Sequence, residues 1–189
     1  MILTIALVSG ASYVFSELQL FGMNQPEGGT STSCSGEPVE LDGARAEIFR
    51  LHNEERTERG IPALCWNEQL ARAATGHSED MMERAFFAHE TPEGMEPSDR
   101  TLAAGYDSPF VAENIMIHHM SSGFEPNIRD SEEIVQGWMN SPGHRKNLLD
   151  PRLKEVGVGT VYGRFGYETN PSGAYTVNFG TPVDQIPSS

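Results

Sequence analysis

The side chains best suited to chemistry in this chain are histidines and one glutamate. The chain has six histidines, and His89, His118 and His144 lie where the surrounding sequence predicts loops or helix ends. Imidazole binds divalent metals and carries protons near neutral pH. If Glu113 lies between two such imidazoles, the three groups can hold zinc and activate water, or relay a proton.

Each histidine taken singly has a simpler interpretation. His52 and His77 lie on apolar faces of predicted helices, where a buried imidazole usually hydrogen-bonds inside the core. His118 and His119 are neighbours where a strand is expected to end, and both are simply explained as polar residues at that exit. The residue types alone therefore do not establish a site, and an argument from the fold is needed.

The motifs of familiar hydrolases do not occur in the sequence. There is no HExxH helix, no G-x-S-x-G elbow and no cysteine in a catalytic setting. Cys34 and Cys65 are the only cysteines, and two of them cannot make a structural zinc site alone. They can form a disulfide if the protein is exported, or Cys65, in the apolar run ALCW, can be a small buried side chain.

Two long helices and two strands follow from the hydrophobic periodicity. Apolar residues at helical spacing predict a first helix over residues 43–59 and a second that begins at the N-cap Asn67 and ends near Arg84. The segments EVGVGTVYG and AYTVNFG alternate as strands do. We expect an α+β domain that forms a three-layer α/β/α sandwich.

Shorter elements connect these parts. A short helix is expected to end at Gly105, and another helix begins near Ser131 and ends at the Ser-Pro-Gly sequence of residues 141–143. His144 is expected to follow that turn directly.

The chain divides into one domain and its flanks. Residues 1–21 are mostly apolar and indicate a secretion signal or a short membrane anchor. Residues 22–42 have the Gly, Ser, Thr, Pro and Glu content of a flexible linker. Residues 43–183 form the predicted domain, and residues 184–189 a disordered tail. The expected location is secreted or at the cell surface, with membrane association through the N-terminus.

The charge of the chain excludes one class of partner. The formal net charge is −14, from 27 acidic and 13 basic residues. A phosphate backbone would be repelled by this surface, so we expect no nucleic-acid partner.

Several motifs occur together in a recognisable order. LHNEERTERGIPALCWNEQLARAA is followed by MMERAFFAH with TPEG, then AENI, then WMNSPGHRKNLLDPRLKEVGVG and finally YTVNFG, over about residues 44–180. Together they resemble the prokaryotic branch of the CAP superfamily, which comprises cysteine-rich secretory, antigen 5 and pathogenesis-related proteins with an SCP-like domain. The resemblance implies the α/β/α sandwich of that superfamily and a central cleft.

The resemblance also implies which residues form the site. The cleft of the family gathers two histidines and two acidic residues, and His89, Glu113 and His144 match three of these positions. In many animal and plant members the second acidic residue lies three positions after the helix tryptophan, but here Trp138 is followed at that offset by Ser141. The set of four is therefore incomplete.

Ser141 and His77 are the further candidates for the cleft. Ser141 can act through a bound water or begin the Ser-Pro-Gly turn, and we favour the turn. Some family members bind metal, so the resemblance implies Zn or another divalent cation. Asn53 and Arg56 match a helix motif of the family and are expected to fix the first helix to the sheet by hydrogen bonds.

Three functions are compatible with these observations. We expect a non-catalytic extracellular binding module, whose cleft holds a metal, a small molecule, a lipid or a cell-surface component. The alternative is a metal-dependent, peptidase-like hydrolase, with Glu113 as ligand or general base. A third function is a surface scaffold for protein contacts, in which the cleft has no chemistry.

Overall fold

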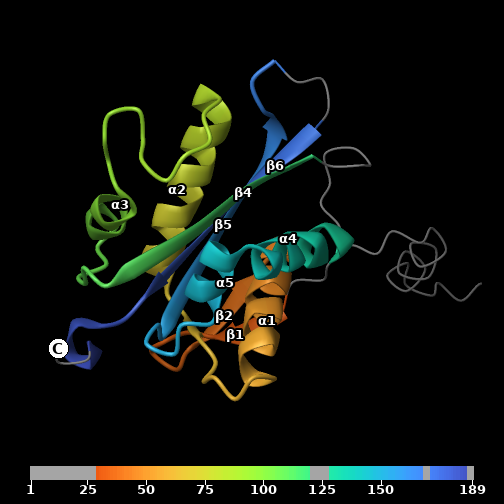
Figure 1. The fold of residues 1–189 in the computed structure, drawn as a ribbon. Helices are drawn as coiled ribbons and strands as arrows, with labels where there is room; N and C mark the ends of the chain where they lie inside the picture. The colour runs from red at the N-terminus through yellow and green to blue at the C-terminus, as the bar shows by residue number, and fades with distance from the viewer. Residues whose placement is uncertain (1–28, 120–127, 168–170, 187–189) are drawn as a thin grey trace, which may run out of the picture.

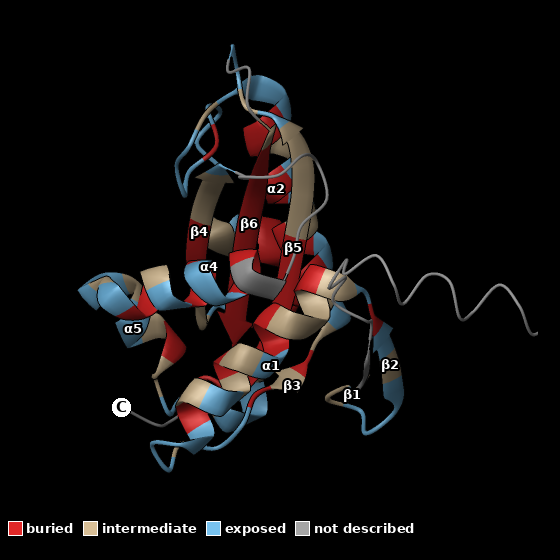
Figure 2. Ribbon diagram, turned by 90° about the vertical axis from the view of Figure 1, so that its right-hand side faces the viewer, coloured by how far each residue is buried: buried red, intermediate tan, exposed pale blue. Residues whose placement is uncertain are grey.

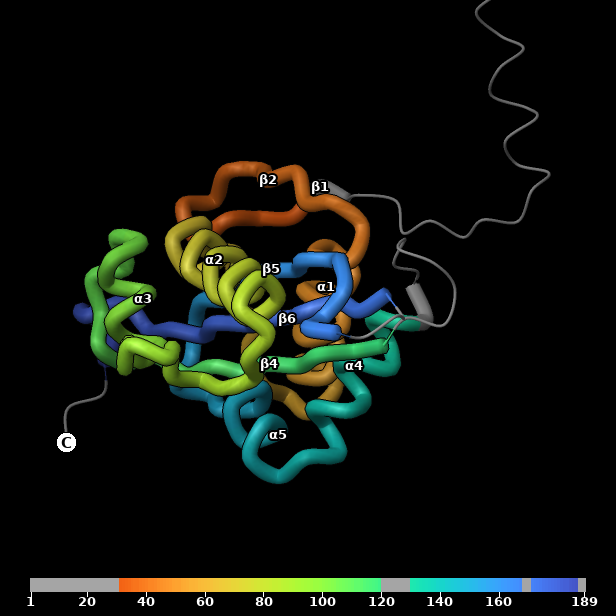
Figure 3. Tube along the Cα trace, turned by 90° about the horizontal axis from the view of Figure 1, so that it is seen from above, coloured from red at the N-terminus to blue at the C-terminus, as the bar shows by residue number. Residues whose placement is uncertain are grey.

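A four-stranded sheet forms the centre of the fold. The computed structural model describes residues 29–119, 128–167 and 171–186. The strands follow the order β3-β5-β6-β4, in which β3 is parallel to β5 and the other pairs are antiparallel. Their bounds are Cys65–Trp66 (β3), Val111–His119 (β4), Glu155–Arg164 (β5) and Pro171–Gly180 (β6). Strands β5, β6 and β4 lie side by side when the molecule is seen from above (Figure 3).

Helices cover both faces of the sheet, which confirms the predicted α+β sandwich (Figure 1). On one face lie α2 and α3, and on the other lie α1, α4 and α5. Their bounds are Gly43–Thr57 (α1), Glu68–Arg84 (α2), Pro97–Ala103 (α3), Ile128–Asn140 (α4) and Pro142–Leu148 (α5).

Strand β6 explains how the two faces differ. Side chains alternate along a strand, so Tyr175, Val177 and Phe179 join the core under α1 and α4. Thr176 points to α2, where the hydroxyl of Ser78 lies 2.9 Å from its own. Strand β6 is accordingly buried over most of its length, and β5 over its first half (Figure 2).

Two glycines of the GVG motif allow α2 to approach the sheet. A Cβ atom on Gly157 would lie 2.0 Å from the backbone nitrogen of Ala71, and one on Gly159 would lie 2.2 Å from that of Thr75. Any side chain at these positions would push the helix away from β5.

The predicted hydrogen bonds of α1 are present, but they tie the helix to loops. The guanidinium of Arg56, which is completely buried, donates to the carbonyls of Pro62, Leu148, Asp150 and Leu153 at 2.9–3.0 Å. Asn53 exchanges two hydrogen bonds with the backbone of Leu64. Helix α1 is therefore attached to the segments that lead into β3 and β5.

The linker prediction for residues 22–42 is wrong over its second half. Strands β1 (Gly29–Thr32) and β2 (Pro38–Leu41) pair as an antiparallel hairpin. A disulfide joins Cys34 to Cys65, and the backbone N–H of Cys34 donates to the carbonyl of Trp66 at 2.9 Å. Backbone pairing and a covalent link thus order a segment whose polar composition supplies little core.

Three other boundaries differ from the prediction or cannot be compared with it. Residues 142–148 form helix α5, so His144 lies on a helix instead of after a turn. Residues 183–185 form a 3₁₀ turn that overlaps the start of the predicted tail of residues 184–189, and residues 187–189 lie outside the described part. The apolar segment 1–21 also lies outside it. Within the described residues, no helix combines the length and the apolar character needed to cross a membrane.

Candidate functional site

Glu113 is a buried carboxylate with hydrogen-bond donors on both oxygens. Its side chain is 1% exposed and lies on β4. His89 Nδ1 lies 2.9 Å from Oε1, and Arg100 Nη2 donates to Oε2 at 2.8 Å. Asn178 lies opposite Glu113 on the neighbouring strand β6. The orientation of the Asn178 amide that makes the most hydrogen bonds lets its nitrogen donate to Glu113 Oε2 (3.0 Å) and its oxygen accept from the N–H of Ala74 (3.2 Å).

A short loop after α2 brings His89 to this carboxylate. Helix α2 ends at Ala85, whose left-handed backbone (φ 53°) turns the chain, and the cap N–H donates to the carbonyl of Met81. His77 Nε2 lies 2.9 Å from the carbonyl of Ala88, the residue before His89. His77 is buried and its Nε2 lies 3.9 Å from Glu113 Oε1. Its position supports the loop, while the side chain of His89 remains 48% exposed.

Asparagines hold the helix that carries His144. Asn114 Nδ2 donates to the carbonyl of His144 at 3.0 Å. Asn147, one turn later on α5, donates to the carbonyl of Glu113 (3.2 Å) and to Asn114 Oδ1 (3.0 Å). The Asn of the AENI motif therefore fixes α5 beside β4.

The protonation of two histidines is shifted by their surroundings. Burial lowers the pKa of His144, and the charge of protonated His89 lowers it further, so the two imidazoles are close enough to repel each other when charged. Burial is also the main cause of the lowered pKa of His77, against a smaller opposing effect of Glu113. Both shifts favour the neutral imidazole at pH 7.

These contacts decide which atoms can take a ligand. Glu113 has a donor on each oxygen and Arg100 neutralises its charge, so it orients His89. If Nδ1 of His89 carries the proton that faces Glu113, Nε2 is a free acceptor. The set therefore offers two imidazoles, with the carboxylate behind one of them, an arrangement that fits a divalent cation with open coordination positions. A bound cation would supply Lewis-acid attraction for an anionic or carbonyl oxygen.

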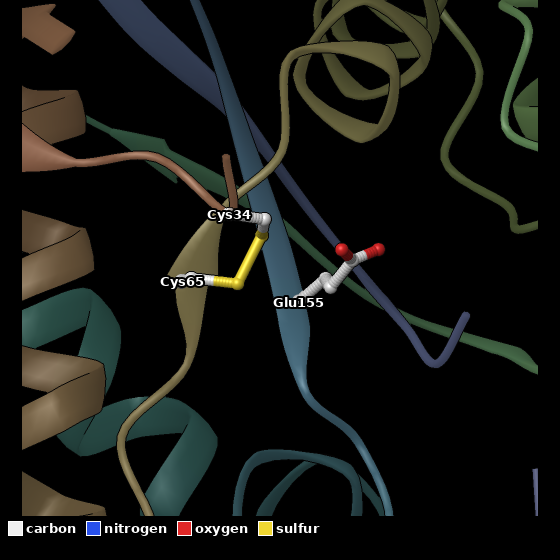
Figure 4. A group of neighbouring side chains, drawn as sticks. All are labelled: Cys34, Cys65 and Glu155. Atoms are coloured by element: carbon white, nitrogen blue, oxygen red, sulfur yellow. A yellow bond between two sulfur atoms is a disulfide. The ribbon is translucent and has the colours of Figure 1, made fainter. Parts of the chain in front are cut away.

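A compact set of three potential ligand side chains occurs elsewhere in the described chain. Ligand atoms of Cys34, Cys65 and Glu155 lie within 4.8 Å of one another (Figure 4). The two sulfur atoms form the disulfide, so they are not available as thiolate ligands.

The structure brings together some predicted residues and separates another. Its hydrogen bonds join His89 to Glu113, and His144 lies within electrostatic range of His89. Ser141 is the N-cap residue of α5. Its side chain makes no capping hydrogen bond, its backbone N–H donates to the carbonyl of Trp138, and its carbonyl accepts from the N–H of Arg145. Ser141 therefore begins a helix instead of the Ser-Pro-Gly turn that we favoured.

Sequence reasoning missed two of the donors to Glu113. Arg100 lies in α3, and Asn178 lies on the strand next to Glu113. The motif YTVNFG contains Asn178 but does not reveal which strand pairs with AENI. No sequence signal distinguishes Arg100 from the other arginines.

The fold and these residues define a CAP domain. The profile of the cysteine-rich secretory protein family, CAP, matches residues 49–179, and the chain belongs to this family.

Relatives occur among proteins of Bacillus subtilis (strain 168). The chain is 33% identical to the uncharacterized protein YkwD over 132 residues, which cover 70% of this chain and 48% of YkwD. It is 34% identical to the uncharacterized membrane protein YlbC over 113 residues, which cover 60% of this chain and 30% of YlbC. The chain thus spans half or less of the length of these relatives.

Two solved structures have the same fold. An extracellular protein containing an SCP domain from Bacillus anthracis str. Ames matches with a TM-score of 0.59 and 33% identity, over 73% of this chain and 40% of that one. An outer surface protein from Borrelia burgdorferi matches with a TM-score of 0.54 and 19% identity, over 82% of this chain and 98% of that one. The second likeness concerns the fold alone.

Proposed function

We propose that this protein is an extracellular binding module in which His89 and His144 hold a divalent cation. Zn²⁺ is the cation that we name first, because neutral imidazole is one of its usual ligands. Open positions on the cation would then capture a small molecule, a lipid headgroup or another component of the cell surface.

The observation that carries the proposal is the environment of Glu113. Arg100, His89 and Asn178 all face its two oxygens, and its side chain is 1% exposed. A carboxylate held in this way orients an imidazole ligand. The lowered pKa of His144 favours the neutral form, which is the form that binds a metal.

The same contacts disfavour a hydrolase. A general base must reach a proton of the attacking water, within about 3 Å or through one further water. Glu113 would first have to exchange its buried contacts with Arg100 and Asn178 for that water. The sequence also lacks the hydrolase motifs, so catalysis remains the second choice.

Three features support the extracellular location. The Cys34–Cys65 disulfide is typical of oxidising compartments. The related structure from Bacillus anthracis is described as extracellular, and YlbC as a membrane protein. The apolar residues 1–21 suit export or membrane attachment.

The test is a calorimetric titration of the full chain with Zn²⁺. We expect saturable binding to the wild type and its loss in the His89→Ala, His144→Ala double variant. The matched control is His118→Ala, His119→Ala, which removes two imidazoles from the far end of β4 and should bind as the wild type does. Equal binding by the wild type and the first double variant would reject the metal site.

A further inference from the structure

A pocket lies apart from His89, Glu113 and His144. Its volume is about 450 Å³. Its walls come from the start of α2, the loop of residues 105–108, the first residue of β5 and residues 182–184. None of the lining residues is basic.

Glu155 is a buried carboxylate in this pocket that lacks a cationic partner. The residue is 8% exposed and lies beside the Cys34–Cys65 disulfide (Figure 4). Asn67 Nδ2 donates to its carboxylate at 3.2 Å, the phenol of Tyr106 lies next to it, and no ion pair to it occurs among the described residues. A buried charge normally has a counter-charge, because the loss of hydration costs several kcal/mol.

Tyr106 places a buried phenol beside this carboxylate. The residue is 5% exposed, and Glu155 is the polar side chain next to its hydroxyl, which makes no well-aligned hydrogen bond within the described part of the chain. Its ring lies against Gly180, where a Cβ atom would come within 2.3 Å of the hydroxyl oxygen. Burial is the main cause of the raised pKa of Tyr106, and the Glu155 carboxylate raises it further. The phenol therefore keeps its proton.

Exposed carboxylates add to the negative charge at the pocket. Asp107 and Asp184 line it and have no ion pair among the described residues. The nearby guanidinium of Arg72 donates to the carbonyl of Ala104 at 3.0 Å and is not part of the lining. The pocket thus combines three carboxylates with no positive charge of its own.

We propose that this pocket binds a primary ammonium group on a short aliphatic stem, such as a lysine side chain. An ammonium group donates three hydrogen bonds to separate acceptors, and Glu155 is the acceptor that most needs a cation. Pro182 and the exposed Val183 offer apolar contact to the stem. The carboxylates of Glu155, Asp107 and Asp184 do not converge within 4.8 Å, and a cavity of this size exceeds a bare metal ion.

This inference goes beyond the proposed function and does not depend on it. The ammonium site uses none of the residues assigned to the cation. A protein that fails to bind Zn²⁺ can therefore still bind the amine, and the His89→Ala, His144→Ala variant should bind the amine as the wild type does.

The test is an NMR titration of the ¹⁵N-labelled full chain with two probes, n-butylammonium and N-acetyl-lysine methylamide. Binding of both indicates that the ammonium and its stem suffice, whereas binding of the second alone indicates a peptide lysine. We expect saturable shifts of the amides of Gln69, Tyr106 and Asp184. n-Butanol and the ε-acetylated lysine compound, which lack the charge, should leave these amides unchanged.

Variants identify the carboxylate that acts. Glu155→Gln should weaken binding at least tenfold, whereas Glu83→Gln, an exposed acid on α2, should not. If Glu155→Gln does not fold, the surface pair Asp107→Asn, Asp184→Asn should still weaken binding. Shifts that are the same with n-butanol, unchanged affinity in the variants, or saturation of the same amides by Ca²⁺ at lower concentration would overturn the proposal.

Discussion

At the scale of single residues, Glu113 shows that a matching motif does not define a role. The sequence predicted Glu113 beside His89, and the two are hydrogen-bonded. The prediction left open whether the carboxylate is ligand, base or support, because its function depends on the donors that tertiary structure brings to it. Arg100 and Asn178 are those donors, and each comes from a different element.

The ion pair between Arg100 and Glu113 gives the first prediction. Arg100→Met leaves a buried carboxylate without its counter-charge and should lower the free energy of unfolding by about 3–5 kcal/mol. Adding Glu113→Gln to that variant removes the charge and should restore much of the loss. Urea unfolding of the wild type, both single variants and the double variant measures the coupling.

Arg84→Met is the matched control for this cycle. Arg84 pairs with Asp80 and Glu93 at the surface, where water screens the charges. Replacing Arg84 should therefore lower the free energy of unfolding much less than replacing Arg100. Additive effects of Arg100→Met and Glu113→Gln would contradict the role of the pair.

His52 gives a prediction for acid stability. It is fully buried between Trp138 and Phe179, and burial lowers its pKa to about 4 from an ordinary value of 6.5. As the pH falls below 6.5, the unfolded chain binds a proton at His52, whereas the folded chain does not. The free energy of unfolding therefore decreases until the pH reaches about 4. The expected loss from this residue between pH 7 and 4.5 is roughly 2–3 kcal/mol.

Urea unfolding at both pH values tests this expectation. His52→Asn should reduce the difference between pH 7 and pH 4.5, even if the variant is less stable at pH 7. The exposed His119, replaced by Asn, should leave the difference as in the wild type. A wild-type protein whose stability is equal at the two pH values would show that His52 is not shielded from solvent.

At the scale of elements, the helices and strands with strong periodicity were predictable and the weakly patterned ones were not. Residues 43–59 and the helix from Asn67 were predicted within a few positions, because their apolar faces fit a helix. The hairpin of β1 and β2 was missed, since its polar, glycine-rich sequence has the composition of a linker and the contact of Cys34 with Trp66 depends on tertiary structure. Helix α5 was missed because the sequence Ser-Pro-Gly is typical of a turn. Proline is also favoured in the first turn of a helix, which is where Pro142 lies.

The hairpin gives a prediction about truncation. Removing residues 1–28 leaves the hairpin and its disulfide, whereas removing residues 1–42 also deletes the buried Leu41. The shorter protein should be less stable by at least the contribution of the disulfide, about 3–4 kcal/mol for a separation of 31 residues. Urea unfolding compares the two truncations, and a Cys34→Ser, Cys65→Ser variant of the longer one isolates the disulfide. Equal stability would mean that the hairpin contributes nothing.

The contact between α2 and β5 gives a prediction with a close control. Gly159→Ala places a Cβ atom 2.2 Å from a backbone nitrogen of α2, so it should cost about 3 kcal/mol or more. Gly143→Ala, on α5, meets no atom within 4 Å and should be neutral or slightly stabilising. Thermal unfolding of both variants distinguishes a packing requirement from a general intolerance of substitution.

At the scale of the whole molecule, charge is the dominant feature. The formal net charge is −14, and ion pairs such as those of Arg50 with Glu47 and Glu54 leave this surplus of negative charge uncompensated. Like charges on a compact surface repel, and folding brings them together. The same surplus attracts cations, in keeping with both proposed sites.

Salt should therefore stabilise the protein. At low ionic strength the repulsion extends over tens of ångströms, whereas at 0.5 M salt it is confined to a few, so the thermal midpoint should rise between about 10 mM and 0.5 M NaCl. Glu79 and Glu83 lie one turn apart on the exposed face of α2, and each replacement by Lys makes the net charge less negative. This double variant should melt higher than the wild type at low salt and respond less to added NaCl. A midpoint that falls with salt in both proteins would mean that attractive ion pairs outweigh the net repulsion.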